Sequence, residues 1–374
     1  MVDIRIGIIG TRFMGRAHSN AYIAVRQVMP VPLNPVLAAA CGRDASHLAK
    51  FADRYGFHSV ESSWREIVAR DDIDLVDICT PNATHLPIAL EAARRKKHIL
   101  CEKPIAMDAG QARQMYEAAA QAGVTHMVGF NYRRVPAVQL AKRLIEKGAV
   151  GRIYHFNAHY LQDWLADPQA PYVWRNDIEQ AGSGAHGDLN SHAVDLARYL
   201  VGEFEAVNGM QDIFIKERPK VNGSIGEVTA DDATGFLARF QSGASGIFMA
   251  TRLATGRKNS LRFEIFGSHG GLAFDLERMN ELEVYTSDDP KEAQGYRRIL
   301  VTERSHPYMT AWWPAGHVIG WGDTFIHETH DLLVAIHDRV PAAPDFLDGW
   351  KCQIVLDAVR DSAAEGRWIT VQVP

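Results

Sequence analysis

The sequence predicts an α/β protein with a doubly wound parallel sheet first and an α+β domain with a large, mainly antiparallel open sheet after it. In the first part, short apolar runs alternate with roughly ten- to fifteen-residue helical patterns, as in a parallel sheet between helices. From Gly151 onward, long strand-like runs are separated by short turns, which is typical of antiparallel pairing. A chain of 374 residues is also long for one core. We therefore predict two domains, residues 1–130 and 131–374.

Composition and charge exclude several classes of function. The hydrophobic share of 47% and charged share of 23% are those of a globular protein. A net charge of −5 gives no case for binding nucleic acid or an acidic membrane surface. No apolar run reaches the roughly 18 residues that a membrane span needs. The chain enters a strand at Ile4 without a signal-like segment before it, so we expect a cytoplasmic protein.

Neither the cysteines nor the histidines show metal-ligand spacing. The four cysteines, at 41, 79, 101 and 352, form no CxxC pair, and the first three end apolar runs. We expect them to be buried and reduced. The sequence His327-Glu328-Thr329-His330 lacks the i,i+4 spacing that places two imidazoles on one helical face. We predict no metal site.

The first strand, residues 4–9, leads into Gly10-Thr11-Arg12-Phe13-Met14-Gly15 and a helix over 16–25. A strand, a glycine turn and a helix in this order indicate a dinucleotide site, with the pyrophosphate on free N–H groups at the helix start. Arg12 stands where a second glycine normally lets the backbone approach the phosphates. Its side chain either supplies charge to the phosphates or points to solvent.

The second strand, residues 36–41, is followed by Gly42-Arg43-Asp44. At this place an NAD enzyme usually has an acid for the ribose 2′-hydroxyl, and an NADP enzyme has an arginine for the phosphate. Arg43 either binds a 2′-phosphate or stacks on the adenine with Asp44 as its partner. These residues leave the choice of cofactor open. The same alternation predicts the rest of the first domain: helices over 45–55, 64–69 and 84–95, strands over 58–60, 75–80, 98–101 and 125–130, and a helix capped by Asp108.

The stretch His98–Pro104 reads as a buried strand that ends in Glu102, Lys103 and a proline. A lysine at the carboxyl end of a parallel strand points into the crevice where such sheets bind ligands. A Lys-Pro bond is also one of the few that can be cis at low cost, which would turn the ammonium into that crevice. Alone, Lys103 could be a solvated loop lysine. Thr80 and Asn82 end the neighbouring strand on the same rim, and this favours a functional lysine.

In the second part, a broad open sheet leaves one face uncovered, and we expect a second subunit to cover it. The segment 303–323 is irregular and rich in aromatic residues, so we interpret it as a lid or a subunit contact. The predicted elements are strands over 152–161, 206–216, 233–241, 244–253, 260–267 and 281–286, and helices over 189–201, 324–339 and 348–365.

The run Gly182–Asp195 carries a second set of polar residues. Asp188 and His192 are i,i+4 and project from one helical face. A histidine beside a carboxylate is suited to proton transfer. The alternatives are a histidine satisfied on a solvated helix face and a structural metal site built from His186, Asp188 and His192.

Taken together, the Gly10–Gly15 loop, Thr80-Pro81-Asn82, Glu102-Lys103-Pro104 and the Asp188…His192…Asp195 run resemble the Gfo/Idh/MocA oxidoreductase family over essentially the whole chain. Within it, residues 129–134, 160–164 and 174–175 make the chain most similar to dehydrogenases of cyclic polyols and sugars, of the scyllo-inositol, L-glucose and levoglucosan type.

The resemblance implies oxidation of a secondary or anomeric hydroxyl of an inositol, aldohexose or anhydrohexose to the ketone or lactone. The expected cofactor is NAD, with NADP kept open by Arg43. Lys103, Asp188 and His192 would be catalytic: His192 takes the hydroxyl proton, Lys103 stabilises the developing alkoxide, and Asp188 orients both. A homo-oligomer, tetramer or dimer, is implied.

The resemblance also implies two sets of binding residues. The cofactor set is Gly10, Arg12, Phe13, Met14, Gly15, Gly42, Arg43, Thr80, Pro81, Asn82, His85, Glu102 and Lys103. The substrate set is Lys103, Asn131, Arg133, Tyr160, Asp163, Trp164, Arg175, Asp188, His192 and His317.

Two rivals share this fold. One is an NAD-requiring glycoside hydrolase, and the other is a nucleotide-sensing regulator without turnover. The presence of Lys103, Asp188 and His192 disfavours the sensor.

Overall fold

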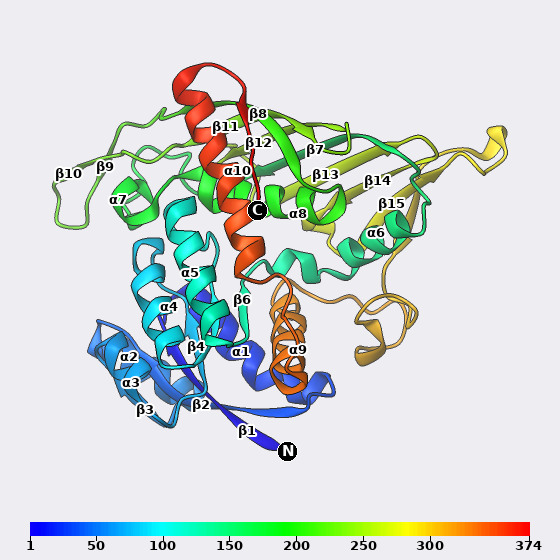
Figure 1. Ribbon diagram of the computed structural model, residues 1–374. Helices are drawn as coiled ribbons and strands as arrows, with labels where there is room; N and C mark the ends of the chain where they lie inside the picture. Colours follow the sequence, from blue (N-terminus) through cyan, green and yellow to red (C-terminus); the bar gives the residue numbers. More distant parts are fainter. The chain divides into compact units, whose positions relative to one another are not determined.

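A computed structural model describes all residues 1–374 and divides them into two compact units (Figure 1). The first unit contains Met1–Arg134 and Gly320–Trp350, and the second contains Val135–Ile319 and Lys351–Pro374. This division differs from the single predicted boundary at residue 130, because residues 320–350 return to the first unit. No helix in the chain is both long enough and apolar enough to cross a bilayer.

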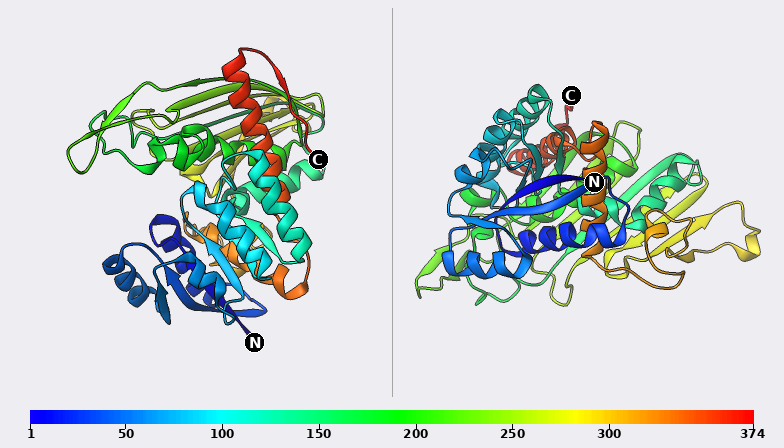
Figure 2. Two further views of the ribbon diagram at one scale, coloured as in Figure 1. Left: turned by 60° about the vertical axis from the view of Figure 1, so that its left-hand side comes forward. Right: turned by 90° about the horizontal axis from the view of Figure 1, so that it is seen from below.

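The first unit is built on one parallel sheet with the strand order β3-β2-β1-β4-β5-β6, which confirms the predicted doubly wound architecture. Helices α1 and α5 lie on opposite faces of this sheet (Figure 2). Its strands are β1 (Val2–Ile9), β2 (Leu33–Cys41), β3 (Ser59–Glu61), β4 (Leu75–Ile78), β5 (His98–Cys101) and β6 (His126–Val128).

The helices of this unit start where the sequence supplies caps. Asp108 accepts the Gln111 N–H at the start of α5, as predicted. Asp44 accepts the His47 N–H at the start of α2, a cap that was not predicted. The returning helix α9 packs against α1, where the rings of His18 and Phe325 lie 5.4 Å apart. The helices are α1 (Phe13–Val28), α2 (Ala45–Tyr55), α3 (Trp64–Ala69), α4 (His85–Arg94), α5 (Ala109–Ala122) and α9 (Asp323–Asp338).

The second unit is built on a nine-stranded sheet with the order β16-β15-β14-β13-β7-β12-β11-β8-β17, in which only β7 and β12 are parallel. The predicted mainly antiparallel sheet is confirmed, but β14, β16, β17 and the separate β9–β10 hairpin were not predicted. The strands are β7 (Ile153–Leu161), β8 (Phe204–Asp212), β9 (Glu217–Pro219), β10 (Ile225–Glu227), β11 (Ala233–Phe240), β12 (Ser245–Thr251), β13 (Ser260–Gly267), β14 (Gly270–Asp275), β15 (Glu281–Thr286), β16 (Arg297–Leu300) and β17 (Ile369–Thr370).

The two faces of this sheet differ in character. One face is buried and carries a phenylalanine cluster, in which Phe156 lies 5.5 Å from Phe248 and 5.9 Å from Phe263 between ring centroids. Helices α6 (Pro136–Glu146) and α8 (Ser191–Leu200) lie on one side of the sheet (Figure 1). The opposite face leaves Ile247 and Met249 about half exposed beside a hollow of about 610 Å³. The short helix α7 (Ile178–Ala181) and the long α10 (Phe346–Glu365), which spans the division at residue 350, complete the chain.

Candidate active site

The glycine loop of the first unit has the close approaches that a dinucleotide site requires. Gly10 has a φ of +104°, and a Cβ there would lie 2.4 Å from the Cys79 carbonyl oxygen. A Cβ on Gly15 would lie 2.0 Å from the Gly10 oxygen. No side chain caps the start of α1, so the first N–H groups of the helix remain available to a phosphate. The loop fits the pyrophosphate of a dinucleotide.

Arg12 lies at the surface beside Asp44, and both of its predicted roles stay open. Its φ of −86° lies outside the left-handed region that favours glycine. Its guanidinium is largely exposed and lies 3.4 Å from the carboxylate of Asp44. Asp44 also accepts the His47 N–H, and that hydrogen bond together with Arg12 lowers the pKa of Asp44. Arg43, which is exposed, keeps both of its predicted alternatives.

The predicted rim is confirmed, because β4 and β5 are parallel neighbours and end at Ile78 and Cys101. Thr80, Asn82 and Lys103 therefore follow adjacent strands at the same edge of the sheet. His85 links the two loops: its Nε2 lies 2.9 Å from the Thr80 oxygen and its Nδ1 lies 3.2 Å from the Pro104 oxygen. Burial lowers the pKa of His85. The Lys103–Pro104 bond is cis, the form that the sequence allows at low cost.

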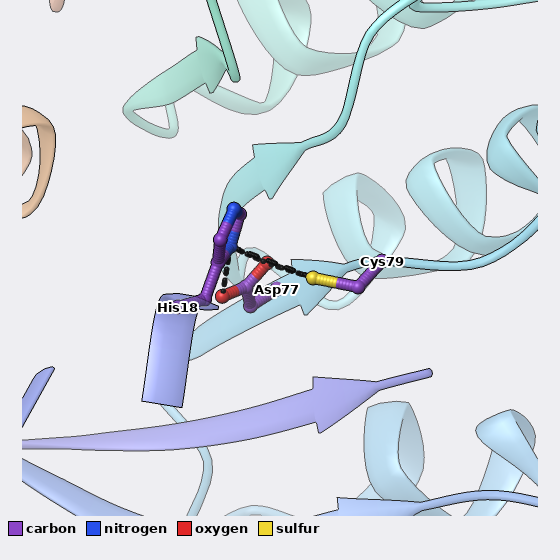
Figure 3. A group of neighbouring side chains, drawn as sticks. All are labelled: His18, Asp77 and Cys79. Atoms are coloured by element: carbon purple, nitrogen blue, oxygen red, sulfur yellow. Dashed lines mark hydrogen bonds and ion pairs between the residues drawn. The ribbon is translucent and has the colours of Figure 1, made fainter. Parts of the chain in front are cut away.

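Behind this rim lies a buried polar cluster that the sequence did not predict (Figure 3). His18 comes from the second turn of α1 and Asp77 from β4. The Nδ1 of His18 lies 2.9 Å from an Asp77 oxygen, and its Nε2 lies 3.0 Å from Glu102 Oε1. Tyr22 donates its hydroxyl to Asp77 at 3.0 Å, and the Cys79 Sγ lies 3.4 Å from His18 Nδ1. We call His18, Tyr22, Asp77, Cys79 and Glu102 the His18 cluster.

Charges within and around the His18 cluster shift two pKa values strongly. Burial alone would lower the pKa of His18, but the Asp77 carboxylate and Cys79 outweigh it, and the pKa lies well above its usual value. Glu328 on α9 is also buried, and burial raises its pKa to about 8 in spite of the opposing charge of His18. At neutral pH the cluster thus holds a charged histidine between carboxylates, with a protonated glutamic acid nearby.

His18, Asp77 and Cys79 each offer a metal-ligand atom, and these atoms lie within 4.8 Å of one another. Both ring nitrogens of His18 already face carboxylate oxygens, however, and a ring bonded in this way is one that donates two protons. The predicted absence of a metal therefore stays a prediction.

In the second unit, Asp188 lies in a cluster of arginines. Arg252 donates from Nη2 to Asp188 at 2.8 Å, and the Arg175 Nε lies 3.4 Å from the same oxygen. The Arg252 side chain is almost fully buried and also donates to the backbone oxygens of Gly184 and Arg175. Asp188 is thus held by two cations that do not lose their protons at ordinary pH. Arg252 directly follows β12, and no sequence motif identified it as a candidate site residue.

Asp188 lies in a π-helical turn, His186–Asn190, that precedes α8. The predicted α-helix over 189–201 is therefore wrong at its start. A π turn has more residues per turn than an α-helix, so Asp188 and His192 do not follow the simple i,i+4 geometry. Such turns occur frequently at functional sites. The Asp231 carboxylate fixes this turn by accepting the backbone N–H groups of Gly184 and His186.

His192 is buried on α8, and its ring lies 5.9 Å from the ring of Tyr160 on β7. The Tyr160 hydroxyl donates to Asn259 at 2.6 Å, and Gln162 donates to the same oxygen at 2.8 Å. Trp164 donates to Gln162 and lies under the Arg252 guanidinium. A chain of contacts therefore joins His192 to Asp188. Its members are Tyr160, Asn259, Gln162, Trp164 and Arg252.

Four other predicted substrate residues are not members of this chain of contacts. Asn131 and Arg133 belong to the first unit, where they contact Thr324 and Asp348. Asp163 pairs with Lys258 at 2.7 Å. His317 is exposed, and its Nδ1 lies 2.8 Å from the Pro314 oxygen. For these four residues a substrate role stays a prediction.

The alternative of a metal site built from His186, Asp188 and His192 is not supported. The Nε2 of His186 lies 2.9 Å from the backbone oxygen of Leu356, and its Nδ1 faces Asn190 at 3.4 Å. Burial lowers the pKa of His186. This histidine packs the π turn rather than facing Asp188.

The aromatic segment, residues 303–323, is divided between the two units at residue 320. In the first unit Trp321 stacks on Phe13 at 5.2 Å between centroids, with the rings 11° apart. Its indole N–H also donates to the Tyr132 hydroxyl. One end of the segment thus packs on the glycine loop.

A parallel sheet of this order with a glycine loop before α1 is the class of domain that binds dinucleotides, and a lysine at the carboxyl end of β5 suits a catalytic site beside the dinucleotide. Two family descriptions match the chain. Residues 4–130 match the oxidoreductase family with an NAD-binding Rossmann fold, and residues 138–273 match the GFO/IDH/MocA C-terminal domain. The chain belongs to the Gfo/Idh/MocA oxidoreductase family.

Individual relatives cover the whole chain. Levoglucosan dehydrogenase of Pseudarthrobacter phenanthrenivorans is 43% identical and aligns over 99% of both chains. Inositol 2-dehydrogenase of Rhizobium meliloti is 28% identical over 99% of this chain and 100% of its own. Among solved structures, levoglucosan dehydrogenase in complex with NADH and levoglucosan is 44% identical, with full coverage of both chains and a TM-score of 0.97. An oxidoreductase domain protein from Kribbella flavida is 47% identical, with the same coverage and TM-score.

Proposed function

We propose that this protein is an NAD-dependent dehydrogenase that oxidises a secondary hydroxyl of a cyclic, uncharged sugar or polyol, with an anhydrohexose such as levoglucosan as the first candidate. The observation that carries this proposal is the full-length likeness to levoglucosan dehydrogenase, a protein known in complex with NADH and levoglucosan. The inositol dehydrogenases are more distant at 24–28% identity.

The catalytic roles belong to the same proposal. Bound NAD supplies the acceptor for the hydride. His192 takes the proton of the substrate hydroxyl as general base. Lys103 donates a hydrogen bond to the same oxygen and stabilises its developing negative charge. Asp188, between Arg252 and Arg175, orients the polar groups around His192.

The residues around His192 support an uncharged ring as substrate. Tyr160, Gln162 and Asn259 offer hydroxyl and amide groups rather than charges. Trp164 offers an aromatic face. Asp188 offsets the charge of one of its two arginines, so these three residues together carry only one positive charge. Hydroxyl-rich rings are recognised by groups of this kind.

The test is a substrate panel with NAD. Purified protein is incubated with NAD and levoglucosan, free hexoses or free inositols, and formation of NADH is followed by absorbance. We expect turnover of levoglucosan or a related pyranose. An NAD-requiring glycoside hydrolase would instead cleave glycosides with no net NADH. A sensor would bind NADH without turnover of any sugar.

We also propose that the open face of the nine-stranded sheet is an interface between copies of this chain. Leu237, Ile247 and Met249 are about half exposed on neighbouring strands β11 and β12, which is a large apolar area for a lone subunit. Light scattering should give a dimer or tetramer, and Ile247→Glu should lower the mass. The four free cysteines, three of them buried, fit a reducing cytoplasm.

A further inference from the structure

The His18 cluster joins three segments of the first unit that are far apart in the sequence. His18 belongs to α1, the helix that follows the glycine loop. Asp77 belongs to β4, and Glu102 begins the turn after β5 that contains Lys103. A side chain that bonds all three can transmit the position of the helix to the turn.

Glu102 is fixed from both sides. Its Oε1 faces His18 Nε2 at 3.0 Å, and its Oε2 accepts the backbone N–H of Lys103 at 3.2 Å. Gly129 provides the space for this carboxylate, since a Cβ there would lie 2.9 Å from Glu102 Oε1. The side chain is buried, so neither contact competes freely with water. The carboxylate therefore determines where the Lys103 backbone lies.

We propose that His18 is a positioning residue for the proposed reaction: its doubly donating ring holds the Glu102 carboxylate and thereby fixes the turn that carries Lys103 to the helix after the glycine loop. A neutral ring carries one N–H and could serve only one of the two carboxylates as a donor. A charged ring serves both, and each bond to a charged partner is stronger than a neutral one.

The surroundings of His18 favour the charged ring. The carboxylates of Asp77 and Glu102 face its two nitrogens, and Cys79 lies beside Nδ1. On the same helix Tyr22 donates to Asp77. From α9, the Phe325 ring packs on His18, and Glu328 acts through its charge only when ionised. The raised pKa of His18 agrees with this arrangement.

The first test is spectroscopic and does not depend on activity. In protein labelled with ¹⁵N at histidine, both ring nitrogens of His18 should show the shifts of protonated nitrogens at pH 8, where an ordinary histidine is neutral. Loss of these signals in His18→Gln assigns them. A neutral ring at pH 8, or one zinc ion per chain bound with Cys79 in metal analysis, would overturn the proposal.

The second test separates positioning from cofactor binding. His18→Gln should lower kcat on the order of 10²-fold, as expected when a catalytic group is misplaced, while the Kd for NADH, from its fluorescence, changes less than about threefold. Gly129→Ala keeps every charge but displaces Glu102, so it should also lower kcat. His327→Gln is the matched control, because His327 is an equally buried histidine of the same unit that faces the Arg134 backbone oxygen.

This inference rests on the proposed role of Lys103, and the two can fail separately. If Lys103→Met keeps full activity, the proposed function of Lys103 fails. If Lys103→Met is inactive while His18→Gln and Gly129→Ala keep full kcat, only the positioning role of His18 fails. Should His18→Gln not fold, the kcat of Gly129→Ala still decides.

Discussion

Each unit contains a carboxylate cluster held by cations, but the two clusters use different cations. In the first unit, Asp77 and Glu102 are bridged by His18. In the second, Asp188 is held by Arg252 and Arg175. Arginine keeps its charge at any ordinary pH, whereas a histidine can lose it. The charge of the first cluster therefore depends on pH, and that of the second does not.

The two kinds of cation therefore suit different roles. A fixed ion pair keeps its geometry while a neighbouring group, which is His192 in the proposed reaction, gains and loses a proton. A histidine between carboxylates makes the position of the turn that carries Lys103 depend on whether the histidine ring is protonated. The protonation state of that ring can be measured. Substitutions in each cluster test whether the two clusters differ in this way.

The largest effect is expected for Lys103→Met. The substitution removes the ammonium and keeps most of the side-chain volume, so folding and NADH binding should survive. Turnover should fall by roughly 10³-fold, because a preorganised charge at the reacting oxygen is lost. Steady-state kinetics measure this. Lys97→Met is the control, since Lys97 lies at the other end of β5 and donates to the Arg70 oxygen. A loss of less than about tenfold in Lys103→Met would leave Lys103 as a loop lysine.

The next effect concerns His192 and Asp188. His192→Ala should lower kcat by about 10²-fold, within the usual contribution of a general base, and should remove the rise of activity with pH. Asp188→Asn should lower it less, because Arg252 and Arg175 remain as hydrogen-bond donors. The double variant should be little worse than His192→Ala, since groups that act as a unit are not additive. If the losses multiply, the two residues act independently.

Much of this arrangement was predictable from the sequence, for identifiable reasons. The order of strands and helices in the first unit follows from apolar runs and caps such as Asp108, which act locally. The rim that carries Thr80 and Lys103 followed from the rule that parallel strands end at one edge. Local signals and one topological rule were sufficient there.

The parts that escaped prediction depend on contacts between distant segments. His18 and Asp77 are 59 positions apart, and Arg252 and Asp188 are 64 apart, so no local pattern joins them. Asp77 did carry a signal, because it is a charged residue inside an apolar strand and needs a partner. The return of residues 320–350 to the first unit has no such signal. It depends on the packing of α9 against α1.

A smaller effect is expected for the choice of cofactor. We expect NAD to be preferred, and Arg43→Ala to change kcat/KM for NAD by less than about threefold, because an exposed arginine contributes little unless a 2′-phosphate is present. Parallel assays with NAD and NADP measure this, with Arg54→Ala as an exposed arginine control in the same unit. A wild-type preference for NADP that Arg43→Ala abolishes would contradict the NAD assignment.

The smallest expected effect is on stability and concerns Glu328, which lies near the His18 cluster. Glu328 has a pKa of about 8 in the folded protein, against an ordinary value of 4.5, and its Oε1 makes no hydrogen bond. Between these values the folded protein binds more protons than the unfolded one, so stability falls as the pH rises from about 4.5 to about 8. His18, whose pKa is also raised, adds to the fall above its ordinary value of 6.5.

Glu328→Gln should remove the part of this loss that comes from Glu328. Its apparent Tm should match that of the wild type near pH 5 and exceed it by a few degrees near pH 8.5, by calorimetry at both pH values. Glu117→Gln changes an exposed carboxylate of the same unit and should leave both Tm values in place. Because His18 still titrates, Glu328→Gln should retain some loss at high pH, which His18→Gln would reduce further. A variant whose Tm follows the wild type at every pH would show that Glu328 is ionised in the folded protein, and the first cluster would then be more negative than described.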